Sequence, residues 1–314
     1  MSLILLVAAA GAGACSDVFS SGEQPPRLSV AEVFDLPPLV FADAGAPPPP
    51  VPAPVERPMV VLISIDGLRP DALFLARTPH LMGLANRGAY TWQAQTILPS
   101  YTLPSHASML SGMPAEQHGI FHNDGGPGFI TVPTVLGVAK AAGKKVVVVV
   151  GKDKLGQLTP PGCCDVFRLA ATSDDAVVAA AVAEVAAGFD LMFVHLPDVD
   201  YAGHAWGWMT RLYLSKVLAA DNAIGRLLAA LPPQATVIAT ADHGGEWYTH
   251  GSSLPEHRTI PWIIAGPGIA PGRRLAAPIA TIDTAATVAS VLGLQLGSDV
   301  PAVPVLEAWM PAPP

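Results

Sequence analysis

Aspartate and histidine side chains, which bind zinc and related metal ions in proteins, gather in one short segment of this chain. The segment 241–251 reads ADHGGEWYTHG and contains Asp242, His243 and His250, directly after the apolar run ATVIAT. Two glycines after His243 let the backbone turn away from an ion without a Cβ clash. The segment therefore predicts a metal site, although taken alone it fits equally well a loop with a solvated acid and a hydrogen-bonded histidine.

Two more segments offer the same side-chain types at the ends of apolar runs. Asp66 follows the run in ISIDGLRPD, and Asp200 and His204 lie in PDVDYAGHAWG. Because Asp200 and His204 are four residues apart, a helical turn would place both on one face. Asp198 is the alternative to Asp200 as a ligand. Together with the first segment, three aspartates and three histidines are enough for two metal ions.

Apolar β-rich runs alternate with helical stretches from Met59 onward. We expect strands at 59–65, 145–150, 190–196, 235–240 and 259–265, and helices near 78–87, 104–112, 132–142, 173–187, 208–231 and 283–292. Continuous apolar strands separated by helices indicate an α/β fold, a three-layer αβα sandwich with a mostly parallel central sheet. Ligands of such sheets bind beyond the carboxyl ends of the strands, which is where the aspartates and histidines lie.

A threonine and two lysines lie near the same strand ends. Thr102 precedes a helix start that contains proline, and the amide groups of that helix would favour an anion beside its hydroxyl. A threonine in this position is otherwise a helix cap. Lys152 and Lys154 follow the strand 145–150, and in an extended segment they would share one side. Both could instead be the solvated end of that strand.

Length and composition bound the class of protein. The 314 residues, 51% of them hydrophobic, suffice for one large folded domain, which we place at 59–314. Seventeen basic residues against 25 acidic ones give a net charge of -8, and the chain has no Lys/Arg run. A role as a nucleic-acid scaffold is therefore not expected.

The first 58 residues differ from the rest in composition. Residues 1–15, MSLILLVAAAGAGAC, resemble a signal peptide whose Cys15 is the lipid-attachment site of a bacterial lipoprotein, although Ala12 stands where leucine is usual and no Lys or Arg precedes the apolar run. The alternative is an apolar tail whose true start codon lies elsewhere. Residues 16–58 are rich in proline and predict an extended, disordered tether. We expect an exported protein of the cell envelope, periplasmic or outer surface, attached to a membrane through Cys15.

The other two cysteines, Cys163 and Cys164, are neighbours in the sequence. Adjacent cysteines rarely form a disulfide with each other because the geometry is strained, and a lone pair is a poor zinc site. They carry no information about compartment.

Five segments taken together resemble the alkaline phosphatase superfamily, on the branch of type I phosphodiesterases and nucleotide pyrophosphatases with a threonine nucleophile. They are SIDGLRPD, PSYTLPSHASMLSGMPAEQHGI, DYAGH, ADHGG and THGSSLPEHRTIPWIIAGPGI, in the family's order between Met59 and Trp309. The resemblance implies an alkaline phosphatase-like catalytic domain. It also implies a phosphoric ester hydrolase that binds two divalent ions, with zinc the expected metal.

The resemblance assigns each residue of the site a role. It places Asp66, Thr102, Asp242 and His243 at one metal ion, and Asp200, His204 and His250 at the other. It implies that Thr102 attacks phosphorus and forms a phosphothreonine, which water then hydrolyses.

Asn123 matches the family asparagine that donates a hydrogen bond to a phosphoryl oxygen, with a turn former as the alternative. Lys152 and Lys154 match a basic pair that in some members holds a phosphate monoester. His257 stands where relatives often have an acid, and we assign it no role. Only six residues separate His243 from His250, so we expect an uncapped, open pocket.

The substrate is expected to be a small phosphate ester, either a monoester or a diester. Hydrolysis of a phosphonate or a nucleotide pyrophosphate on the same fold is the alternative. A sulfatase would need a Cys or Ser nucleophile and an arginine that the segment around Thr102 lacks, and a phosphomutase would need a serine and a further domain. A lipid-anchored surface protein without turnover is the distant alternative. The oligomeric state stays open.

Overall fold

The computed structural model describes residues 58–124 and 128–309. The expected signal segment and nearly all of the proline-rich tether lie outside these residues. Eight strands form one sheet in the order β4-β3-β5-β1-β6-β7-β2-β8. The strands are β1 (Met59–Ile65), β2 (Ala89–Gln95), β3 (Val146–Val150), β4 (Val166–Leu169), β5 (Leu191–Leu196), β6 (Ala235–Thr240), β7 (Thr259–Ala265) and β8 (Arg273–Arg274).

The sheet is mostly parallel, and the helices that connect its parallel strands cover both of its faces. Strand β7 runs antiparallel to its neighbours β6 and β2, while the five other pairings are parallel. The central strands β1, β3, β5 and β6 are almost wholly buried, as their unbroken apolar sequences require. The α/β sandwich expected from the sequence is confirmed.

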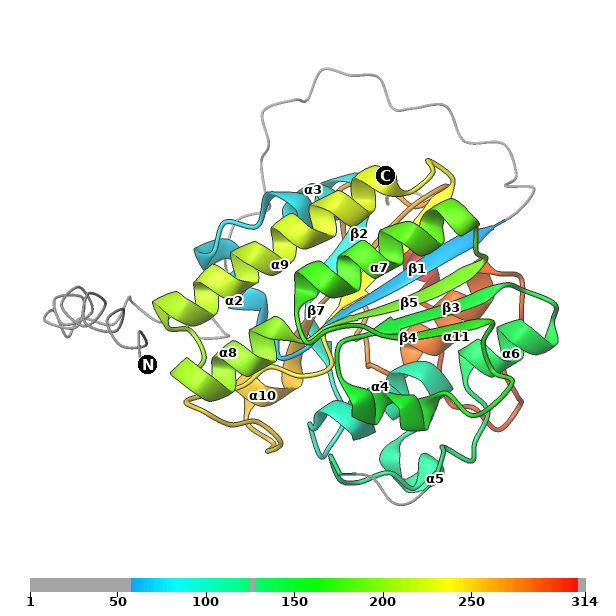
Figure 1. Cartoon of the computed structure of the whole chain (residues 1–314), viewed down its shortest axis with the longest axis horizontal. Helices are drawn as coiled ribbons and strands as arrows, with labels where there is room; N and C mark the ends of the chain where they lie inside the picture. Colours follow the sequence, from blue (N-terminus) through cyan, green and yellow to red (C-terminus); the bar gives the residue numbers. More distant parts are fainter. Residues whose placement is uncertain (1–57, 125–127, 310–314) are drawn as a thin grey trace, which may run out of the picture.

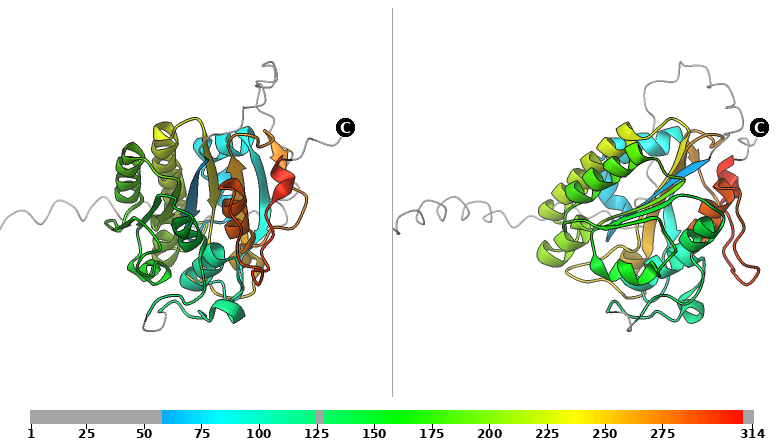
Figure 2. Two further views of the ribbon diagram at one scale, coloured as in Figure 1. Left: turned by 90° about the vertical axis from the view of Figure 1, so that its right-hand side faces the viewer. Right: turned by 45° about the vertical axis from the view of Figure 1, so that its right-hand side comes forward.

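The helices form two layers, one on each side of the sheet (Figures 1 and 2). One layer contains α2 (Pro70–Leu75), α3 (Pro79–Arg87), α7 (Asp174–Ala187), α8 (Asp198–Trp206) and α9 (Arg211–Ala230). The other contains α4 (Thr102–Ser111), α5 (Ala115–His118), α6 (Val135–Ala141) and α11 (Asp283–Val291). Three short turns complete the described chain, namely η2 (Asp153–Leu158), α10 (Pro255–Arg258) and η3 (Leu306–Trp309).

The register of the three central strands brings their carboxyl ends level. Ile65 of β1 pairs with Leu196 of β5, and Ser64 pairs with Thr240 of β6. The residues that follow these strands therefore meet at one edge of the sheet. Within the described residues, no helix is both long and apolar enough to cross a membrane.

Candidate two-metal active site

The edge of the sheet formed by the ends of β1, β5 and β6 holds all six expected aspartate and histidine ligands. Asp66 follows β1 directly, Asp200 and His204 lie on α8 just after β5, and the others lie in the loop after β6. Gly67 has a left-handed backbone with φ of 71°, and a Cβ added there would lie 3.0 Å from the Asp200 Cα. Glycine at this turn therefore allows the backbone beside Asp66 to approach Asp200 closely.

The three histidines present the same nitrogen to the centre of this edge. Each Nδ1 donates a hydrogen bond to a backbone carbonyl, which leaves the Nε2 lone pair free to bind a metal. The bonds run from His204 to Tyr248 (2.9 Å), from His243 to Gly244 (2.7 Å) and from His250 to Ser100 (3.0 Å). Burial lowers the pKa of His243 and of His250 to about 3, so both rings are neutral at physiological pH.

The three aspartates each use one oxygen for hydrogen bonds or ion pairs and keep the other free. Asp242 Oδ1 accepts from the amides of Gly67 and His243, and the Oδ2 atoms of Asp66 and Asp200 contact Lys152. Among the residues that the structure describes, the remaining oxygens of these three carboxylates are buried without a hydrogen-bond partner. Buried polar atoms of this kind call for a ligand.

The free atoms fall into two groups with the spacing of metal ligands. Ligands about 2.0–2.2 Å from a tetrahedral zinc ion lie about 3.3–3.6 Å from one another. His243 Nε2 lies 3.4 Å from Asp66 Oδ1 and 3.3 Å from Asp242 Oδ2. Asp200 Oδ1 lies 3.4 Å from His204 Nε2 and 3.7 Å from His250 Nε2. These histidine–carboxylate spacings thus fit one divalent ion in each group, and Asp200 also lies within 4.8 Å of the ligand atoms of Asp66 and His243.

The electrostatics of the site also favour cations. Burial alone would raise the pKa of Asp66, but the Lys152 ammonium and the His195 hydrogen bond outweigh it and hold that pKa well below its usual range. Burial and the neighbouring Asp66 charge raise the pKa of Asp242 well above its usual range. The three buried carboxylates carry more negative charge than the one lysine neutralises. Two divalent ions would supply the missing positive charge.

Thr102 lies beside the first group of ligands. It is the first residue of α4 and is 1% exposed, and its Oγ1 lies 3.3 Å from His243 Nε2. The Thr102 carbonyl accepts a hydrogen bond from His106 Nδ1 at 2.7 Å. The hydroxyl makes no helix cap, because the N-cap position belongs to Tyr101. The side chain therefore lies beside the ligand group of Asp66, Asp242 and His243.

Asn123 and Lys154 line one cavity near the start of α4. Asn123 Oδ1 accepts a hydrogen bond from the Leu103 amide at 2.9 Å, which fixes the asparagine next to the start of α4. A cavity of about 530 Å³ is lined by Asn123, Asp124, Asp153, Lys154 and Gln157. This polar cavity adjoins the site.

The two lysines do not share one side of an extended segment, and that expectation was wrong. The chain enters the 3₁₀ turn η2 at Asp153, directly after Lys152, so that the two side chains diverge. Lys152 is 6% exposed and reaches Asp66 and Asp200, while Lys154 is half-buried at the cavity. Burial of the apolar Leu155 and Leu158 favours the turn over an extended chain.

One functional residue was missed in the sequence. His195 Nε2 lies 2.8 Å from Asp66 Oδ2, and the ring is fully buried. A partner of this kind orients a ligating carboxylate. The available signal was a histidine inside the otherwise apolar strand LMFVHL.

The residues with alternative or unassigned roles lie apart from the two ligand groups. Asp198 pairs with Lys216 at 3.1 Å, and Asp200 rather than Asp198 groups with His204 and His250. His257 accepts a hydrogen bond from the Ser252 amide at 3.1 Å. Cys163 and Cys164 are free thiols.

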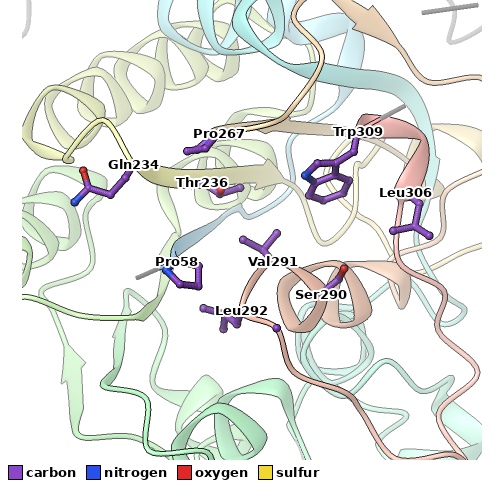
Figure 3. Close-up of a pocket in the computed structure, with 10 residues that line it drawn as sticks. Pro58, Gln234, Thr236, Pro267, Ser290, Val291, Leu292, Leu306 and Trp309 are labelled. Atoms are coloured by element: carbon purple, nitrogen blue, oxygen red, sulfur yellow. The ribbon is translucent and has the colours of Figure 1, made fainter. Parts of the chain in front are cut away.

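A second cavity, of about 420 Å³, lies at the other end of the sheet (Figure 3). It is lined by Pro58, which precedes β1, by Thr236 near the start of β6, and by apolar residues that include Leu292 and Trp309. None of the residues that line it is titratable. The chemistry therefore belongs to the carboxyl ends of the strands.

Several known proteins are similar to this chain in sequence or in fold. Human ectonucleotide pyrophosphatase/phosphodiesterase family member 5 is 35% identical over 69 residues, which are 22% of this chain and only 14% of that protein. The solved structure of the murine family member 5, an inactive variant in complex with AMP, has a TM-score of 0.64 at 16% identity and covers 77% of this chain and 96% of that one. Phosphonate monoester hydrolase from Silicibacter pomeroyi has a TM-score of 0.66 at 18% identity and covers 82% of this chain and 78% of that one.

At these identities the solved structures show a shared fold. The family model described as type I phosphodiesterase / nucleotide pyrophosphatase matches residues 60–125 and 130–253, which are more than half of the chain. The chain therefore belongs to the type I phosphodiesterase / nucleotide pyrophosphatase family.

Proposed function

We propose that this protein is a metal-dependent phosphoric ester hydrolase with Thr102 as its nucleophile. The observation that carries the proposal is the buried Thr102 hydroxyl at 3.3 Å from His243 Nε2, beside the free oxygens of Asp66 and Asp242. A hydroxyl among metal ligands is suited to attack on phosphorus. Membership of the family supports the class of reaction.

The two ligand groups would each hold one divalent ion. Asp66, Asp242 and His243 form the first group, together with Thr102. Asp200, His204 and His250 form the second. The ions would lower the pKa of the nucleophile and neutralise charge on the phosphoryl oxygens.

The chain's own residues define the course of the reaction. The Thr102 oxygen forms a bond to phosphorus, the bond from phosphorus to the leaving alcohol breaks, and a phosphothreonine results. Water then attacks this intermediate and restores the hydroxyl, and the product released is phosphate from a monoester or a phosphate monoester from a diester. Since Asn123 uses its Oδ1 for the Leu103 amide, its Nδ2 donates to a non-bridging phosphoryl oxygen. In-line attack from Thr102 directs the leaving group towards the side of His204 and His250.

Zinc is the proposed ion, because three imidazoles and three carboxylates suit it better than magnesium, which prefers oxygen ligands. The proposed substrate is a small phosphate ester. The exposed side chains of Trp247 and Tyr248, in the short loop before His250, are consistent with an open site. We also propose an exported, lipid-anchored protein, supported by the sequence before Cys15, and the mass of the mature N-terminal peptide tests it.

The test is hydrolysis of p-nitrophenyl phosphate and bis(p-nitrophenyl) phosphate by the full chain. We expect chelation to abolish turnover, zinc to restore it, and Thr102→Ala to lower kcat at least about 10³-fold. Thr131→Ala, at an exposed threonine, is the matched control and leaves kcat unchanged. Turnover that survives both chelation and Thr102→Ala would contradict the proposal.

A further inference from the structure

Lys152 lies between the two groups of metal ligands and contacts both. Its Nζ is 2.5 Å from Asp200 Oδ2 and 2.7 Å from Asp66 Oδ2, and the residue is 6% exposed. Asp66 belongs to the first ligand group and Asp200 to the second. One ammonium group therefore joins the two halves of the site.

The contacts of Lys152 divide each carboxylate into an outer and an inner oxygen. The outer Oδ2 atoms of Asp66 and Asp200 face the ammonium, and the inner Oδ1 atoms are those left without a partner among the described residues. These inner atoms are also the ones that lie 3.4 Å from the His243 and His204 Nε2 atoms. The ammonium thus contacts the ligands without occupying the positions that ions would take.

The donors of Lys152 are largely committed to protein groups. An ammonium has three N–H donors, and two of them serve the two carboxylates. The ammonium also lies 5.1 Å from the centroid of the Tyr201 ring, within the range of a cation–π contact. Little capacity is left for a substrate phosphate.

We propose that Lys152 is a positioning residue, a built-in counter-cation that orients Asp66 and Asp200 for the two metal ions and limits how tightly the site holds those ions. The inference rests on the two-metal site of the proposed function. Three carboxylates, one ammonium and two divalent ions leave two net positive charges. A phosphate monoester dianion balances this charge, so the lysine favours both release of the ions and acceptance of the substrate more than a neutral side chain does.

The charge balance predicts the direction of the effect. Without Lys152, three buried carboxylates have no cation beside them in the metal-free protein, which destabilises its fold. Bound ions remove the repulsion among these carboxylates. The ions are also attracted more strongly, because no ammonium offsets the carboxylate charge. Metal-free stability therefore falls while affinity for zinc rises.

The test compares Lys152→Met with Lys154→Met in the full chain. Three quantities are measured: Tm after chelation, zinc retention in competition with a chelator, and the kcat and KM of aryl phosphate hydrolysis. We expect Lys152→Met to lower the metal-free Tm, to enlarge the rise in Tm on zinc addition and to retain zinc at least tenfold more tightly. Lys154→Met is the control and leaves the metal-free Tm and zinc retention unchanged, because its side chain contacts none of the ligands.

Lys152→Gln serves as a second variant, since glutamine keeps hydrogen-bond donors but not the charge, and we expect the same direction of change. Equal or weaker zinc retention in both Lys152 variants overturns the inference. So does an unchanged metal-free Tm with a raised KM, which would show that Lys152 holds the substrate instead. Tm and zinc retention do not depend on turnover, so a failure of the proposed hydrolysis is seen separately.

Discussion

Replacing Asp174 by asparagine should stabilise this protein at alkaline pH and have little effect at acid pH. Asp174 begins α7 and is 3% exposed, and its Oδ1 accepts a hydrogen bond from the Asp198 amide at 3.0 Å. Its Oδ2 has no hydrogen-bond partner within the described part of the chain. Burial and the Asp198 carboxylate raise the pKa of Asp174 to about 7, with Lys216 opposing them and Asp175 adding to them.

The sign follows from the difference between the folded and unfolded pKa values. An unfolded aspartate has a pKa of about 3.9, so between about pH 4 and pH 7 the folded state binds the proton more tightly. The contribution of Asp174 to the free energy of unfolding is therefore fully present below about pH 4 and is lost as the pH rises through 7. The loss approaches roughly 4 kcal/mol above pH 8, of which roughly 3 kcal/mol falls between pH 5 and pH 8. Asp174→Asn also removes an acid from the first helical turn, and this loss offsets at most about 1 kcal/mol of the expected stabilisation.

The assay is Tm from pH 5 to pH 8.5 for the wild type and for Asp174→Asn, both saturated with zinc. A domain of this size shifts by about 2–4 °C per kcal/mol, so the gap between the two proteins should widen by about 5–10 °C. Asp175→Asn is the matched control, because it removes the same charge from the same turn at an exposed side chain. Parallel curves for the wild type and Asp174→Asn would refute the reasoning. An equal gain for Asp175→Asn would assign the effect to net charge instead of burial.

Two further predictions concern the surroundings of the metal ligands. His195→Ala should weaken zinc retention about 10–100-fold, because it removes the hydrogen bond that orients Asp66, and chelator competition measures this against the exposed control His122→Ala. Equal retention in both variants would remove His195 from the site. Gly245→Ala should lower stability by about 1–3 kcal/mol, because the added Cβ would lie 2.3 Å from the Trp208 ring. Gly137→Ala, on α6 with no atom nearer than 3.8 Å, should instead raise Tm slightly, and the reverse order of the two Tm values would contradict the packing argument.

The strands that were predicted well share one property, which is an unbroken apolar run. The predictions for β1, β3, β5, β6 and β7 agree with the structure to within one residue at each end. Strand β2 was missed because AYTWQAQ mixes polar and apolar residues. It forms a strand because it pairs with β7. Strand β4 was missed because it is short, exposed and at the edge of the sheet.

The sequence by itself determined which side chains could bind metal and that strand ends would carry them, because residue type and apolar periodicity are local properties. It could not determine which oxygen of Asp66 or Asp200 stays free, or that His195 lies behind Asp66. The sequence pattern also left Lys152 and Lys154 as an equivalent pair. Only the tertiary structure separated them, because the turn at Asp153 and the parallel register of β3, β5 and β1 direct one ammonium between two carboxylates from distant segments.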